Sequence, residues 1–309
     1  MSEKMMARDV YGETLVELGR KNKDIVVLDA DLSGSTRTVK FGKAFPERFF
    51  NIGVAEQNLI GVAGGLASCN KTVFASTFAI FASGRAWDQV RNTIVYNKLN
   101  VKIVASHAGI TVGPDGASHQ AVEDIALFRV LPEMVIMVPC DGPQTRDIIR
   151  LAAGYKGPVY VRMGRAKIPT IENKPKFEMG KAQILRQGRD VSIIACGIMV
   201  KNALDAAGIL AQENKQARVV NMHTIKPIDR QAIIDCAKQT KGIVVCEEHM
   251  INGGLAGAVS EVSSESAPVP IQRIGIKNRF GQSGSPDELL KKYNLTAGDI
   301  VEACRKLMQ

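Results

Sequence analysis

The stretch that begins with Thr72-Val-Phe-Ala-Ser76, continues through a helical pattern over 83–99 and ends with Val101-Lys-Ile-Val-Ala105 decides the fold. Both short runs are mainly apolar, which is typical of strands buried on both faces of a sheet. A strand, a helix and a second strand form the unit from which parallel sheets are built. The sequence therefore predicts an α/β fold around a mainly parallel sheet.

The same alternation extends in both directions along the chain. Further strands are expected at 25–28, 134–138 and 159–161, and helices at 7–21, 56–68 and 144–155. The stretch 166–189 is rich in Lys, Arg and Pro, which favours an exposed connection. Strands and helices alternate again beyond it. We therefore expect two α/β domains, each a mainly parallel sheet flanked by helices, at 1–170 and 189–309, with a linker at 171–188.

Composition places the chain among ordinary globular proteins. Its 309 residues are 45% apolar and 23% charged, which excludes a disordered tail, a collagen and a small disulfide scaffold. The longest apolar stretches, 59–69 and 73–84, are shorter than the ~20 residues of a membrane-spanning helix. Residues 1–10 lack the apolar core of a signal peptide. We therefore expect a cytoplasmic protein with no membrane attachment.

The net charge of +9 permits an anionic partner. Basic residues are scattered along the chain, and aromatic residues, at 5%, are too few for extensive base stacking. We expect no nucleic-acid partner and favour an anionic small substrate. The six cysteines follow no zinc or redox spacing, so we interpret them as reduced, buried thiols and predict no metal site in this chain.

The most specific segment is Gly53-Val-Ala-Glu56-Gln57-Asn58, in which Glu56 opens a helix rich in apolar and small residues. A glutamate in the first turn of a helix can simply complement the helix dipole. A carboxylate in an apolar pocket can instead have a raised pKa and take part in proton transfer. The segment alone leaves both interpretations open.

Two further segments follow predicted strands, where ligands bind in open α/β sheets. Phe78 and Phe81 are three residues apart on a predicted helical turn, where they can form a core pair or stack on a planar heterocycle. The loop from His107 to His119 is rich in Gly and also holds Asp115. Its spacing fits no common metal motif. We interpret it as a polar substrate-binding loop rather than as structural turns.

Together these segments resemble the second half of a transketolase, a thiamine-diphosphate enzyme. The resemblance covers nearly the whole chain in the family's order. It implies a pyrimidine-binding domain followed by the family's C-terminal domain. It is carried by Leu28-Asp-Ala-Asp31-Leu-Ser-Gly-Ser35, Asn51-Ile-Gly-Val-Ala-Glu56-Gln, Thr77-Phe-Ala-Ile-Phe81 with Trp87-Asp-Gln89, the loop from His107 to His119, Leu131-Pro-Glu-Met-Val, Thr224-Ile-Lys-Pro-Ile-Asp229 and Phe280-Gly-Gln-Ser-Gly284.

One family motif is missing from the sequence. The diphosphate-binding domain of the family carries Gly-Asp-Gly with a later Asn, which hold Mg²⁺ (or Ca²⁺) and the cofactor diphosphate. This chain has no Gly-Asp-Gly, so it resembles the C-terminal subunit of a split, two-chain transketolase. The resemblance implies an N-terminal partner subunit, an α2β2 heterotetramer, and transfer of a two-carbon ketol unit between sugar phosphates of the pentose phosphate pathway.

The resemblance also implies roles for individual residues. Glu56 would hydrogen-bond N1′ of the cofactor's aminopyrimidine, and His107 and His119 would be the other catalytic residues. Many family members have an aromatic residue where this chain has Gly84. The cofactor-binding residues implied are Asp31, Glu56, Phe78 and Phe81, and the substrate-binding residues are Arg8, Ser35, His107, Asp115, His119 and Arg165.

Three alternatives stay open. Deoxyxylulose-phosphate synthase shares the Gly-x-Ala-Glu-Gln pattern, but it usually has an arginine where His107 stands and is normally one long chain. The β-type subunits of 2-oxo acid dehydrogenases share the two-domain plan but lack the His-x7-Asp-x3-His loop. A non-catalytic subunit that retains the fold is the third alternative, and the intact Glu56, Asp115 and His119 argue against it.

Overall fold

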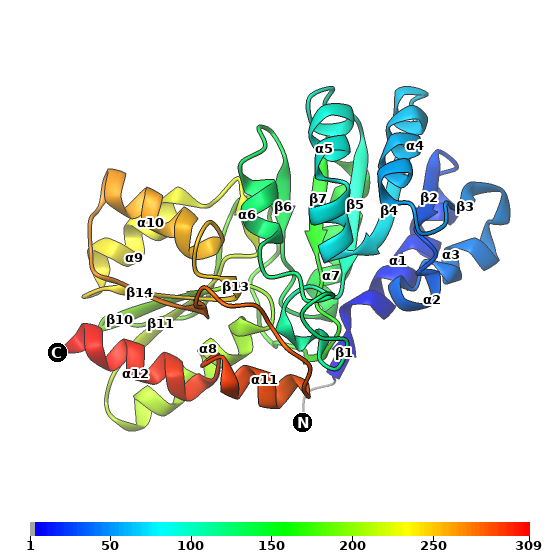
Figure 1. Ribbon diagram of the computed structural model, residues 1–309. Helices are drawn as coiled ribbons and strands as arrows, with labels where there is room; N and C mark the ends of the chain where they lie inside the picture. Colours follow the sequence, from blue (N-terminus) through cyan, green and yellow to red (C-terminus); the bar gives the residue numbers. More distant parts are fainter. Residues whose placement is uncertain (1–3) are drawn as a thin grey trace.

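The computed structural model describes residues 4–309, so the first three residues of the predicted first domain lie outside it. Its two main sheets belong to two domains, which stand at the right and left of Figure 1. The first sheet has the order β12-β6-β7-β5-β4-β2-β3 and is parallel except for β12. Its strands are β2 (Ile25–Asp29), β3 (Phe49–Asn51), β4 (Thr72–Phe78), β5 (Val101–Ser106), β6 (Val135–Met137), β7 (Val159–Arg162) and β12 (Thr224–Lys226).

Helices cover both faces of this sheet, which explains its continuous apolar strands. Alternate residues of β2 point to opposite faces: Ile25 and Val27 pack in one hydrophobic cluster, and Val26 and Leu28 in another. The first cluster includes residues of α1 (Ala7–Lys21) and α7 (Gly142–Gly154), and the second includes residues of α4 (Glu56–Ser68). The predicted α/β architecture is confirmed.

The helical stretch after β4 differs from the single helix predicted over 83–99. Two π-helical segments, Phe81–Arg85 and Val90–Val95, flank the short helix α5 (Trp87–Gln89). Phe78 belongs to β4 rather than to a helical turn, so the prediction for that residue was wrong. The turns of a π-helix are wider than those of an α-helix, and π-helical segments often occur at functional sites. Despite the wider turns, Ala82, Ala86 and Val90 are fully buried in the core.

The second sheet has the order β14-β13-β10-β11-β9 and is parallel except for β9. The final helix, α12, was not predicted, although its capping box of Thr296 and Asp299 is a recognisable start signal. The elements of this domain are β9 (Gln183–Arg186), β10 (Val191–Ala195), α8 (Met199–Gln212), β11 (Ala217–Asn221), α9 (Arg230–Gln239), β13 (Ile243–Met250), α10 (Leu255–Ser266), β14 (Ile271–Ile276), α11 (Pro286–Lys292) and α12 (Ala297–Met308).

The segment predicted as an exposed connection is more structured than expected. β8 (Lys167–Pro169) pairs with β1 (Lys4–Met6), and β9 joins the second sheet although it lies within the predicted linker 171–188. The buried Asp141 carboxylate accepts a hydrogen bond from the Ile171 backbone N–H at 2.9 Å and pairs with Lys174. Because these contacts join residues far apart in sequence, local composition could not predict them.

The two domains share part of their core. β12 follows β11 of the second domain in the chain, yet it pairs with β6 of the first sheet. One hydrophobic cluster contains Phe128 from the first domain and Met222 and Leu255 from the second. The domains therefore meet through continuous apolar packing.

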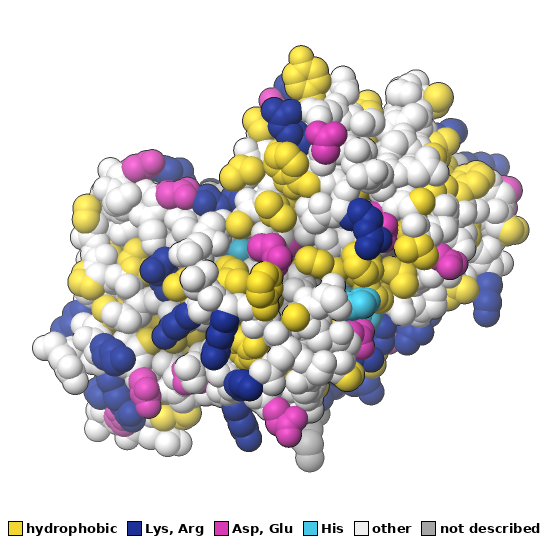
Figure 2. Space-filling model, in the orientation of Figure 1, with side chains coloured by type: hydrophobic (Ala, Val, Ile, Leu, Met, Phe, Trp, Pro, Cys, Tyr) yellow, Lys and Arg dark blue, Asp and Glu magenta, His cyan; other side chains and the backbone are white. Residues whose placement is uncertain are grey.

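The surface matches the scattered charge of the sequence. On the face shown in Figure 2, Lys and Arg side chains are spread over both domains, with Asp and Glu among them. All six cysteines are unpaired thiols and only Cys69 is exposed. Within residues 4–309, no helix is both long and apolar enough to cross a membrane.

Candidate active site

The residues predicted to form a site gather at the carboxyl end of the first sheet. Parallel strands end at the same edge, so the residues that follow different strands come together there. Asp31 follows β2, Glu56 begins α4 after β3, Phe78 ends β4, His107 follows β5 and Arg165 follows β7.

Glu56 is the buried acid of this edge. It is the first residue of α4, where the helix dipole favours a carboxylate, and its side chain is 1% exposed. Arg85 Nη1 donates a hydrogen bond to Glu56 Oε2 at 2.7 Å. Glu56 Oε1 is buried and has no hydrogen-bond partner among the described residues. One oxygen of the carboxylate is therefore an acceptor whose hydrogen-bonding capacity is unused within residues 4–309.

Aromatic rings stack beside this carboxylate. The Phe78 and Phe81 rings are 6.0 Å apart and nearly parallel, and the His107 ring stacks on Phe78 at 3.8 Å. The Arg85 guanidinium lies 4.6 Å from the centre of the Phe81 ring, a cation–π contact. His119 meets the Phe81 ring edge-on at 5.4 Å. The predicted aromatic pair is thus brought together with both histidines of the loop.

His107 is held as a neutral imidazole. Its Nδ1 lies 2.9 Å from Ser106 Oγ. Burial and, to a smaller extent, the positive charges of Arg8 and Arg165 lower the pKa of His107 to about 3. Near neutral pH, His107 can therefore donate or accept a hydrogen bond without adding charge.

Two cations of the site, Arg8 and Arg165, both act electrostatically on His107. Arg8 Nη1 donates to the Ser35 backbone oxygen at 3.0 Å, and burial is the main cause that lowers the pKa of Arg8. Arg165 Nη1 donates to the Val112 backbone oxygen at 2.6 Å and lies 3.9 Å from Asp115 Oδ1. Two guanidinium groups beside a neutral imidazole suit an anion such as a phosphate.

Asp31 stands apart from these contacts. Its backbone has a φ of 61°, and Asn51 Nδ2 donates to Asp31 Oδ1 at 2.7 Å. Asp31 is exposed, and this pair lies at the rim of the first sheet, where β2 and β3 end.

Arg85 is the site residue that the sequence interpretation missed. Its spacing of four residues from Phe81 is a usable signal, because such pairs lie on one side of a helical segment. The partnership with Glu56 spans 29 positions and has no local signature.

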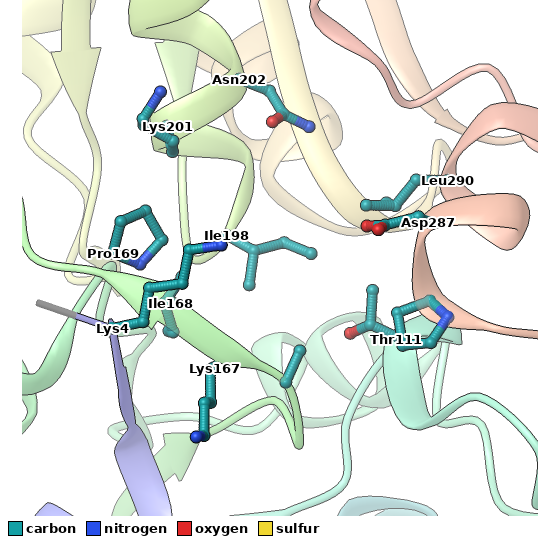
Figure 3. Close-up of a pocket in the computed structure, with 12 residues that line it drawn as sticks. Lys4, Thr111, Lys167, Ile168, Pro169, Ile198, Lys201, Asn202, Asp287 and Leu290 are labelled. Atoms are coloured by element: carbon teal, nitrogen blue, oxygen red, sulfur yellow. The ribbon is translucent and has the colours of Figure 1, made fainter. Parts of the chain in front are cut away.

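A hollow of about 440 Å³ lies between the domains and is separate from these residues. In Figure 3 the ammonium groups of Lys167 and Lys201 point away from its middle. Lys201 pairs with Asp205 instead. None of the predicted site residues lines this hollow.

Within residues 4–309, no group of three or more His, Cys, Asp or Glu is placed to hold a metal ion.

Comparison with known proteins identifies the family of both domains. Residues 3–170 match the family model of the transketolase pyrimidine binding domain, and residues 180–300 match that of the transketolase C-terminal domain. A protein of Methanocaldococcus jannaschii described as a transketolase C-terminal section is 54% identical over 98% of this chain and 96% of its own length. A 6-deoxy-6-sulfo-D-fructose transketolase subunit of a Clostridium species is 40% identical, over 99% of this chain and 96% of that subunit.

A solved structure of a split-gene transketolase, described as an inactive β4 tetramer, superposes with a TM-score of 0.92. It is 53% identical, and the match covers 98% of each chain. The fold and the two family models thus define a two-domain α/β protein that joins a pyrimidine-binding domain to a transketolase C-terminal domain. The chain belongs to the transketolase family, and it is of the split-subunit type.

Proposed function

We propose that this chain is the C-terminal subunit of a thiamine-diphosphate-dependent transketolase. The enzyme would move a two-carbon ketol unit between a ketose phosphate and an aldose phosphate. The observation that carries the proposal is the buried Glu56 carboxylate beside the stacked rings of Phe78 and Phe81. One of its oxygens has no hydrogen-bond partner within residues 4–309.

These residues fit an aminopyrimidine. Glu56 Oε1 would share a proton with N1′ of the ring, and the half-buried Phe81, with Phe78 behind it, would present an aromatic face. Asp31 would approach the cofactor from the rim of the site. When bound, thiamine diphosphate supplies the nucleophilic carbon needed to cleave and form a carbon–carbon bond.

The remaining residues suit a sugar phosphate. Arg8, Ser35, His107 and Arg165 would bind the phosphate, since guanidinium groups form strong charge-assisted hydrogen bonds with phosphate oxygens. Asp115, beside Arg165, would accept a hydrogen bond from a substrate hydroxyl. His119, next to the Phe81 ring, would hold or release the proton of the reacting hydroxyl.

Activity would require a second chain. The N-terminal partner subunit would carry the diphosphate-binding domain and the Mg²⁺ (or Ca²⁺) site, in an α2β2 assembly in the cytoplasm. Two descriptions support this proposal: the similar archaeal protein is a C-terminal section, and the similar β4 tetramer is inactive.

The decisive experiment mixes the chain with its N-terminal partner, thiamine diphosphate and Mg²⁺, and assays ketol transfer from xylulose 5-phosphate to ribose 5-phosphate. We expect turnover by the mixture and none by this chain alone. Full turnover by the chain alone would refute partner dependence. No turnover with any ketose would favour a non-catalytic subunit.

Parallel assays separate the remaining alternatives. 6-Deoxy-6-sulfo-D-fructose is tested as a second donor, because a relative 40% identical is a subunit of a transketolase named for that sugar. Pyruvate is tested with glyceraldehyde 3-phosphate, and pyruvate with an electron acceptor. Reaction with pyruvate in place of ketoses would favour a synthase or a 2-oxo acid dehydrogenase subunit.

A further inference from the structure

Glu248 reaches from the second domain to the loop that carries His107, Asp115 and His119. It lies on β13 and is 4% exposed. Its Oε1 accepts a hydrogen bond from the Thr111 backbone N–H at 2.6 Å. We infer that Glu248 is a positioning residue, which fixes this loop so that its side chains meet the substrate. The inference rests on the proposed function and assigns a role to the second domain.

The contact at Gly109 shows how closely the carboxylate supports the loop. A Cβ atom at Gly109 would lie 2.2 Å from Glu248 Cδ and about as close to both carboxylate oxygens. Gly109 also has a φ of 80°, a conformation that favours glycine. The Glu248 carboxylate therefore occupies the space in which any side chain at position 109 would stand. It packs directly against the loop backbone and fixes the distance between that backbone and β13.

The far end of the loop is tied to the same strand. The Met250 backbone N–H donates to the Val122 oxygen at 2.7 Å, and Arg162 Nη2 donates to the backbone oxygens of Glu248 and Ala121. The two ends of the loop are also joined directly, since the Gly109 N–H donates to the Ala121 oxygen at 2.7 Å. Both ends thus rest on β13, and the exposed tip holds Asp115.

A buried carboxylate is costly, which argues against simple packing as its role. Burial raises the pKa of Glu248 to about 7, although the Arg162 charge and the Thr111 hydrogen bond oppose the rise. A leucine of similar size would fill the space without this cost but could not accept the Thr111 hydrogen bond. The acceptor itself is therefore the property that the site requires.

Small displacements of the loop would affect the site strongly. Misplacement of catalytic groups by about 1 Å can reduce rates by a factor of about 100. His107 lies only two residues before Gly109, and its ring stacks on Phe78 at 3.8 Å. A loop released from Glu248 would lose the spacing between its substrate-binding residues and the aromatic rings.

The test compares Glu248→Ala and Glu248→Gln with a matched control, Glu247→Ala. Glu247 is also a buried carboxylate of β13, but it accepts from the Leu255 and Ala256 backbone N–H groups at the start of α10. Hydrogen exchange is measured on the full chain. We expect Glu248→Ala to speed exchange in peptides covering 107–122 about tenfold, and Glu247→Ala to leave those peptides unchanged. Glu248→Gln, which keeps an acceptor oxygen, should restore most of the protection.

The second readout is kinetic and uses the complex with the N-terminal partner. We expect Glu248→Ala to raise the KM for the sugar phosphate about tenfold and Glu247→Ala to change it less than twofold.

Unchanged loop exchange in Glu248→Ala, or an equal rise in KM for both alanine variants, would overturn the inference. If Glu248→Ala does not fold, Glu248→Leu takes its place, because leucine fills the space but has no acceptor for the Thr111 N–H. Exchange in peptides covering 107–122 about tenfold faster than in the natural chain supports the inference, and an unchanged rate refutes it. Hydrogen exchange is measured without any enzymatic turnover. A failure of the proposed function would therefore appear in the kinetic readout alone and can be distinguished from a failure of this inference.

Discussion

Arg85 Nη1 lies 2.7 Å from Glu56 Oε2, and the same guanidinium covers the Phe81 ring. Glu56 is 1% exposed whereas Arg85 is 47% exposed, so the pair stands at the boundary between the core and solvent. Arg85 therefore gives the buried acid a counter-charge and leaves its second oxygen without a hydrogen-bond partner among the described residues. This arrangement links the proton-holding group of the site to its aromatic platform.

The ion pair should couple the two residues energetically. Removing one partner leaves the other charge uncompensated, so single substitutions should cost more than the pair contributes. In a cycle of Glu56→Gln, Arg85→Ala and the double variant, we expect a coupling free energy of about 1–3 kcal/mol. Urea unfolding of the four chains measures it. Additive effects within about 0.5 kcal/mol would mean that the contact does not stabilise the chain.

Glu56→Gln should abolish most turnover of the assembled enzyme and leave the fold intact. The amide has nearly the same shape, but it cannot exchange a proton with the pyrimidine nitrogen. General acid–base groups contribute factors of about 10² to 10⁴, and we expect a fall in kcat of that order. Ketol-transfer kinetics and circular dichroism check the two parts. A variant with near-normal rates would refute the role of Glu56.

The sequence predicts best what depends on local pattern. The apolar runs of β2, β4 and β5 and the helix α1 follow from periodicity alone. The strand ends indicate Phe78, Phe81 and the loop from His107 to His119. The resemblance to transketolase is what adds Arg8, Asp31, Ser35 and Arg165 to the candidate site. Glu248 and Thr111 are 137 positions apart, so only the folded chain reveals their contact. The same holds for β9, a four-residue strand whose place depends on its pairing with β11.

Gly84→Tyr should strengthen cofactor binding. Among the described residues, a Cβ atom at Gly84 would meet nothing within 4 Å, so the backbone at this position leaves room for a side chain to begin. An added aromatic contact contributes about 0.5–1.5 kcal/mol, which corresponds to a roughly two- to tenfold lower Kd for thiamine diphosphate. Calorimetric titration of the assembled complex measures it. Gly84→Ala is the control for backbone effects, and weaker binding by the tyrosine variant alone would contradict a platform at this position.

His107 should remain neutral across the physiological range. Burial lowers its pKa to about 3, whereas an unfolded histidine titrates near 6.5. The imidazole resonances of His107, identified by their absence in His107→Gln, should therefore show no titration between pH 8 and pH 5. A midpoint near pH 6.5 would contradict this burial.

The same shift should make folding stability depend on pH. Because the folded pKa lies below the unfolded one, the unfolded chain binds the proton first as the pH falls. The stability contributed by neutral His107 is thus complete above about pH 6.5 and is lost progressively towards pH 3. Between pH 7 and pH 4.5, the natural chain should lose on the order of 2 kcal/mol more stability than His107→Gln. Urea unfolding of both chains at the two pH values measures this difference. Parallel losses in the two chains would mean that His107 takes up its proton equally in the folded and unfolded chains, which would contradict its burial as a neutral imidazole.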